Sequence, residues 1–183
     1  MISEEIQLFR NKLRQDPVNQ NNRRLFHELF EWLESFWNRN YAGNNGLSNF
    51  SNQFDDFYWN IPELKKLSGR LCMYPPIGNS NNNFIPQENI LRATYHLRHH
   101  SNLFDGINMP PVNDGDEDKG NLWQHSKLET ILTIVSQIRN NLFHGRKMEV
   151  EEEQYQRNKE LIAISVKISN LILENLVEAE NNN

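Results

Sequence analysis

Residues 128–145 read LETILTIVSQIRNNLFHG, and this stretch carries the most regular pattern in the chain. Its apolar residues step by three, four, three and four positions, the spacing of one face of an α-helix: Leu128, Ile131, Val135, Ile138 and Leu142. Gly145 stands where the C-terminal cap of such a helix is expected. A second apolar stripe follows between Val150 and Ala179, so we predict two long helices that form an antiparallel hairpin.

Helical spacing also recurs in the rest of the chain, where it predicts helices over Ile2–Leu13, Arg23–Asn40, Pro62–Leu71 and Pro86–Ser101. The helix over 23–40 should sit deep in the core, because one face carries Leu25, Leu29, Trp32, Leu33 and Phe36, with Phe26, Phe30 and Trp37 beside them. Residues 16–22, 41–60, 72–83 and 102–120 read as connecting segments. No segment alternates as a strand does, so we expect an all-α fold, a bundle of four to five helices with long polar loops, in one domain over residues 1–183.

The composition is polar but compatible with a core. Asparagine accounts for 28 of the 183 residues, and because it favours caps and turns it predicts the long loops. The formal charge of -5 argues against a protein that coats nucleic acid by bulk electrostatics. Cys72 is the single cysteine, so the chain cannot form an internal disulfide, which suggests a reducing compartment. No apolar run is long enough to span a membrane, and the first residues are acidic where a signal peptide would be basic and then apolar. We therefore expect a cytoplasmic protein.

The end of the 128–145 stretch carries the candidate chemistry. Arg139 and His144 are about 140° apart on an ideal helix, but a cap at Gly145 leaves the His144 side chain able to turn back over the roughly 7.5 Å to Arg139. The helix dipole favours a protonated imidazole there, and a guanidinium offers a planar fork to a phosphate. Histidine as proton shuttle and arginine as charge stabiliser suit phosphodiester chemistry. The alternative is an ordinary solvated helix end with a surface arginine and a capping histidine.

With Asn140 after the arginine and Gly145 after the histidine, this Arg-x4-His motif resembles the HEPN superfamily of ribonucleases, and NLFHG with Lys147 resembles one large bacterial branch of it. The resemblance is strongest over residues 121–178. It implies a metal-independent endoribonuclease that needs no cofactor, in which the ribose 2′-OH attacks the adjacent phosphate. It implies Arg139 and His144 as catalytic residues, Asn140 and Asn141 as supporting residues, and Arg146 and Lys147 as contacts to the RNA backbone.

The resemblance also implies a homodimer, because the reaction needs a base and an acid, and two motifs that meet across a two-fold interface supply one histidine each. Family members often act as toxins or antiphage effectors, and many pair with a nucleotidyltransferase antitoxin that modifies a tyrosine soon after the motif histidine. Here the first tyrosine is Tyr155. A non-catalytic HEPN module that binds RNA or a partner protein, and a structural helical subunit of a larger system, are the alternative hypotheses.

Three further patterns each have a functional interpretation and an ordinary structural one. His96 and His100 have the spacing of metal ligands, but no nearby Cys or Glu completes a ligand set. Arg92, His96 and His99 form a stripe on the same predicted helix, which either contacts RNA phosphates or is an ordinary solvent-exposed face. Asp114, Asp116 and Asp118 resemble a calcium loop, but Lys119 and His125 occupy its glycine and glutamate positions. The aromatic group of Phe50, Phe54, Phe57, Tyr58 and Trp59 either stacks bases or packs on the core.

The charge is unevenly distributed along the chain. Residues 121–148 hold four cations, Lys127, Arg139, Arg146 and Lys147, against the single carboxylate of Glu129, a local charge of +3 before any histidine is protonated. A weakly acidic chain can therefore present a basic pocket, which suits the cutting of selected RNA better than the coating of it.

Overall fold

The computed structural model describes residues 4–41, 45–72, 124–143 and 152–182, and within these ranges the chain is helical with no strand. The helices are α1 (Glu4–Gln15), α2 (Pro17–Asn40), α3 (Gly46–Trp59), α4 (Pro62–Cys72), α7 (Lys127–Phe143), α8 (Glu152–Glu174) and α9 (Leu176–Asn181). The prediction of an all-α fold is confirmed for the described part of the chain, but the seven helices there exceed the four to five that were predicted. The predicted helix over 86–101, the histidine stripe and the acidic 114–118 segment lie outside the described residues.

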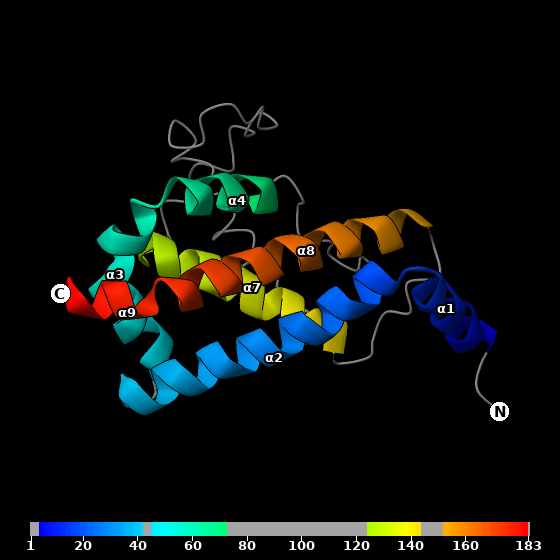
Figure 1. Cartoon of the computed structure of the whole chain (residues 1–183), viewed down its shortest axis with the longest axis horizontal. Coiled ribbons are helices and arrows are strands. Elements are labelled where there is room, and N and C mark those ends of the chain that lie inside the picture. The colour runs from blue at the N-terminus through cyan, green and yellow to red at the C-terminus, as the bar shows by residue number, and fades with distance from the viewer. Residues whose placement is uncertain (1–3, 42–44, 73–123, 144–151, 183) are drawn as a thin grey trace.

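Two long helices, α2 and α8, run side by side along the length of the molecule, and the others pack around them (Figure 1). Helix α7 runs in the opposite direction to α8, as the hairpin prediction required, but it packs chiefly on α3. Helix α4 lies on α8, while α1 packs against α2 at the end of the molecule opposite to α9 (Figure 1). The core is therefore built between α2, α3, α7 and α8, with α4 adding the buried Leu64, Leu67 and Leu71.

Helix α2 begins at Pro17, so the prediction of a connecting segment over 16–22 is wrong. Asp16 caps the helix by accepting a hydrogen bond from the Asn19 backbone N–H at 3.1 Å, and Pro17 occupies the first turn, where its missing N–H costs nothing. The Asp16 carboxylate also accepts from Lys159 Nζ at 2.6 Å and from the Tyr155 hydroxyl at 3.4 Å. The hydrogen bond from Lys159 holds the pKa of Asp16 below its usual value.

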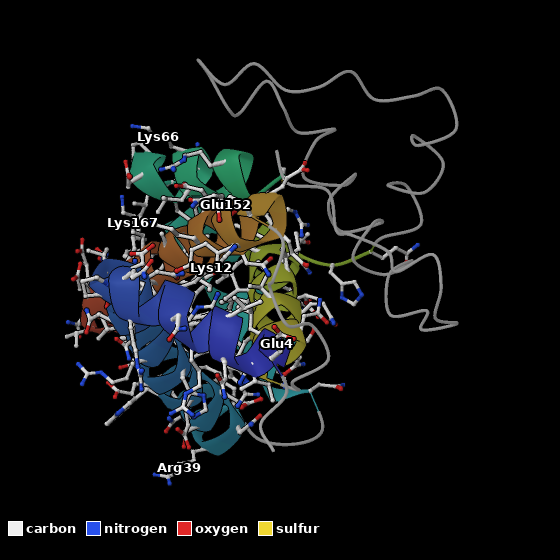
Figure 2. The ribbon with its side chains drawn as sticks, turned by 90° about the vertical axis from the view of Figure 1, so that its right-hand side faces the viewer. Glu4, Lys12, Arg39, Lys66, Glu152 and Lys167 are labelled. Carbon is white, nitrogen blue, oxygen red and sulfur yellow. The ribbon has the colours of Figure 1, made fainter. Side chains whose placement is uncertain are left out.

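Contacts at this end of the molecule fix α1 and the start of α2 to α8. Beside the Asp16 contacts, Lys12 of α1 pairs with Glu152 of α8 at 2.9 Å between Nζ and Oε2. Both side chains are labelled in Figure 2, where they lie on neighbouring helices of the same face. The exposed Lys12–Glu152 pair adds little stability, whereas Asp16 combines a cap with an ion pair.

Residues 46–59 form helix α3, which corrects the prediction that 41–60 is irregular. Phe50, Phe54 and Tyr58 follow one another at helical spacing and are 0–1 % exposed. Their rings contact one another, and the Phe50 and Phe54 centroids lie 5.2 Å apart. The packing alternative for this aromatic group is therefore the correct one, because these three rings face the core and leave no surface on which a base can stack.

The core face of α2 differs from the predicted one. Phe26, Phe30, Leu33 and Trp37 are buried, whereas Trp32 is 71 % exposed. Leu25, Leu29 and Phe36 are only partly buried and lie, with Trp32, on a second apolar strip about 100° around the helix. The prediction that Trp32 belongs to the core is wrong, because the helix buries the strip that meets α8.

The C-terminal segment contains two helices where a single one over 150–179 was predicted. Helix α8 ends at Glu174 and α9 begins at Leu176. The Asn175 side chain between them donates from Nδ2 to the Leu171 carbonyl at 2.8 Å. Because its amide competes for a backbone acceptor in this way, asparagine favours a helix end at this position.

Candidate functional site

Arg139 lies in the last turns of α7, and its side chain reaches across to α2. The apolar stripe of α7, which includes the buried Leu128, Ile131 and Val135, turns toward the core and so sets the direction in which Arg139 points. The guanidinium carbon lies 5.7 Å from the centroid of the Phe30 ring, within range of a cation–π interaction. The Arg139 side chain is 23 % exposed, so it is a partly buried charge held against an aromatic face.

The donors of Arg139 are largely unused by the described residues. Nη1 donates to Asn140 Oδ1 at 3.3 Å, and Nη2 lies 3.9 Å from Glu34 Oε2, which is ion-pair range but too long for a hydrogen bond. Nε is buried without a hydrogen-bond partner among those residues. A guanidinium that is positioned by an aromatic ring and has several unfilled donors is suited to bind an oxyanion by donating hydrogen bonds to it.

The two predicted supporting residues have different surroundings. Asn140 contacts the Arg139 guanidinium directly. Asn141 is exposed, and its side-chain oxygen accepts from Gln137 Nε2 at 2.8 Å, one turn back along α7. The structure thus brings Asn140 together with Arg139 and places Asn141 in a separate surface contact.

The remaining predicted site residues, His144, Arg146 and Lys147, lie outside the described residues. The described part of the site is therefore the arginine half of the motif together with the face of α2 that it meets.

Phe30 and Glu34 of α2 complete this part of the site, and sequence reasoning missed both in that role. They are one helical turn apart, so they present a ring and a carboxylate to the same guanidinium. Glu34 is 42 % exposed. Nothing near either residue in the sequence marks it as a neighbour of Arg139, because the contact depends on how α2 and α7 pack.

A second polar cluster, at the start of α7, has a structural role. Ser126 accepts from the Glu129 backbone N–H at 3.2 Å, and the Glu129 carboxylate accepts from Ser48 Oγ at 3.1 Å and lies 2.9 Å from His125 Nδ1. Asp55 of α3 accepts from the Leu128 backbone N–H at 2.7 Å. These bonds satisfy the first N–H groups of α7 and fix it to α3.

The described residues contain no group of three or more His, Cys, Asp or Glu side chains arranged to hold a metal ion. No helix among them is both long and apolar enough to cross a membrane. Comparison with known proteins adds no assignment, since no family model, no curated protein and no solved structure matches this chain.

Proposed function

We propose that the protein is a metal-independent endoribonuclease of the HEPN type. Arg139 binds the scissile phosphate and stabilises the charge that grows on it, and Asn140 holds the guanidinium in place. His144 transfers a proton, Arg146 and Lys147 attract the RNA backbone, and Asn141 supports the end of the helix.

The reaction is a transesterification. The ribose 2′-oxygen loses its proton and forms a bond to the neighbouring phosphorus, while the bond from phosphorus to the 5′-oxygen breaks. The 5′-oxygen takes up a proton, so the products are a 2′,3′-cyclic phosphate and a 5′-hydroxyl. Charge accumulates on the non-bridging oxygens, and a preorganised guanidinium acts on that charge.

The state of Arg139 is the single observation that carries this proposal. Its guanidinium is partly buried against Phe30, its Nε is buried without a partner among the described residues, and its only carboxylate neighbour there lies at 3.9 Å. A structural arginine would be expected to fill its donors, because a buried unpaired N–H costs free energy. A phosphate that arrives from solvent would fill the Nη donors, which the described residues leave largely unused.

The proposal extends to the setting in which the enzyme works. We propose a homodimer in which two motifs form a composite site, and a role as a cytoplasmic toxin or antiphage effector. A regulatory protein or antitoxin is the expected partner. These extensions depend on the sequence resemblance alone.

The test is cleavage of a labelled mixed RNA pool by the purified protein in EDTA. We expect the wild type to cut, and Arg139→Ala and His144→Ala to lose at least about 100-fold in rate. Arg39→Ala is the matched control, because it removes an exposed arginine at the far end of α2 (Figure 2) and should leave the rate unchanged. Cleavage that survives both motif substitutions would contradict the proposal.

The same preparations test the alternative function, a non-catalytic module that binds RNA or a partner protein. Its prediction is RNA binding by the wild type that weakens in Arg139→Ala, with no cleavage of any RNA. A 21.7 kDa species alone in sedimentation would contradict the composite dimer.

A further inference from the structure

Glu34 lies beside Arg139 and has no role in the reaction as proposed above. Its Oε2 lies 3.9 Å from Arg139 Nη2, and its side chain is 42 % exposed, so the carboxylate borders the guanidinium and remains open to solvent. Among the described residues no donor forms a hydrogen bond to it. The ion pair with Arg139 is the one interaction of Glu34 within the described part of the chain.

One nucleotide can reach both groups. A phosphate oxygen bound to Nη2 lies about 2.9 Å from it, and an attacking oxygen lies roughly 3–3.5 Å from phosphorus in a near-attack geometry. A general base must approach that hydroxyl to about 2.6–3.2 Å. These distances fit the 3.9 Å between Arg139 Nη2 and Glu34 Oε2 when the path from the phosphate to the 2′-OH bends back toward α2. A phosphate bound to the guanidinium therefore brings its neighbouring 2′-OH within reach of the carboxylate.

We propose that Glu34 is the general base of the reaction. Its carboxylate removes the proton from the 2′-OH as the oxygen bonds to phosphorus, and the 5′-oxygen departs with a proton from His144 or water. This inference depends on the proposed ribonuclease function and changes one part of it: the base comes from α2 of the same chain that supplies Arg139, rather than from a second histidine across a dimer interface.

The competing explanation is that Glu34 only neutralises or orients Arg139. The two explanations differ in what the removal of the charge does. Loss of a base slows the chemical step and leaves phosphate binding intact, whereas loss of an orienting partner weakens binding as well. Because the carboxylate also repels phosphate, binding should not weaken when it becomes neutral.

The test compares Glu34→Gln with Glu31→Gln in single-turnover cleavage of the RNA that the wild type cuts best. Glu31 is the matched control, since it is exposed on the same helix and pairs with His27 at 3.9 Å, away from Arg139. We expect a fall of about 100-fold or more for Glu34→Gln and less than about twofold for Glu31→Gln. Affinity for the same RNA with 2′-deoxyribose at the cut site should stay within about threefold of the wild type, or become tighter.

A second variant separates a base from a structural carboxylate. Glu34→Ala leaves space beside Arg139, so formate in the buffer should restore part of its rate in proportion to concentration. The same salt should not affect Arg139→Ala. Mixing Glu34→Gln chains with Arg139→Ala chains should not restore activity, because both groups of one site belong to one chain.

The outcomes separate this inference from the function on which it depends. Wild-type protein that cuts no RNA would contradict the ribonuclease function and this inference together. Wild-type cleavage that is abolished by Arg139→Ala, with Glu34→Gln as active as Glu31→Gln, would contradict the role of Glu34 alone. Loss of affinity in Glu34→Gln that matches its loss of rate would show an orienting role and would also contradict the base.

Discussion

The Tyr58 hydroxyl is a buried polar contact that joins two of the core helices. It donates to the Ile172 carbonyl at 2.8 Å, from α3 to α8, and the residue is 0 % exposed. Replacement by phenylalanine removes one oxygen and keeps the ring against Phe54 and Phe50. At pH 7 we expect Tyr58→Phe to lower the free energy of unfolding by about 1–2 kcal/mol, the hydrogen bond plus part of the cost of a carbonyl left without its donor.

The same substitution has a predictable dependence on pH. Burial raises the pKa of Tyr58 in the folded protein, while an unfolded tyrosine titrates at about 10. As pH rises past that value the unfolded wild type loses a proton that the folded form keeps, so wild-type stability falls, by about 1.4 kcal/mol at pH 11. Tyr58→Phe lacks this proton, so the difference between the two proteins should shrink above pH 10 and close near pH 11.

The assay is urea unfolding of both proteins between pH 7 and 11. Phe54→Leu serves as a control, because it weakens the same core without a titrating group and its deficit should not change with pH. A deficit for Tyr58→Phe below about 0.3 kcal/mol at pH 7, or one that grows with pH, would refute the reasoning.

Three further substitutions test the fold. Asp16→Asn keeps a good helix cap but loses the charge that faces Lys159, so we expect a cost of about 0.5–1 kcal/mol in urea unfolding at pH 7. Because the pKa of Asp16 is lowered in the folded state, that cost should fade as pH falls below about 4, and a constant deficit would count against the ion pair. Gly46→Ala places a Cβ 2.9 Å from the Trp37 carbonyl oxygen, so thermal melting should show a loss of about 1–3 kcal/mol despite the better helix propensity of alanine; an unchanged melting temperature would contradict this close approach. Trp32→Gln should change the free energy of unfolding in urea by less than about 0.5 kcal/mol, since the side chain is 71 % exposed. A large loss of stability would contradict this exposure.

Local patterns in the sequence were sufficient to predict α7, because its apolar residues keep one spacing over the whole helix. They were not sufficient for α2, where two apolar strips lie about 100° apart. Whether Phe30 or Trp32 enters the core depends on which strip meets α8, and that is a property of the packing. Helix α3 was not predicted because its asparagines and glycine suggest a loop. The segment becomes helical because its aromatic side chains pack in the core.

The candidate site divides in the same way. Arg139 and Asn140 are adjacent in the sequence, so their contact follows from the motif. Phe30 and Glu34 belong to a different helix, and no local signal links them to Arg139. The contact between Arg139 and Asn140 could be expected from the motif. The contacts of Arg139 with Phe30 and Glu34 depend on helix packing and could not be predicted.

The central claim is that Arg139 holds an RNA phosphate while the neighbouring 2′-OH attacks it. Mass analysis of the ends that the wild type produces from a defined RNA in EDTA tests this most directly. We predict a 2′,3′-cyclic phosphate opposite a 5′-hydroxyl, and no cutting when the 2′-OH at the cut site is methylated. Ends that carry a 3′-hydroxyl and a 5′-phosphate, or cleavage of the methylated RNA, would contradict the account.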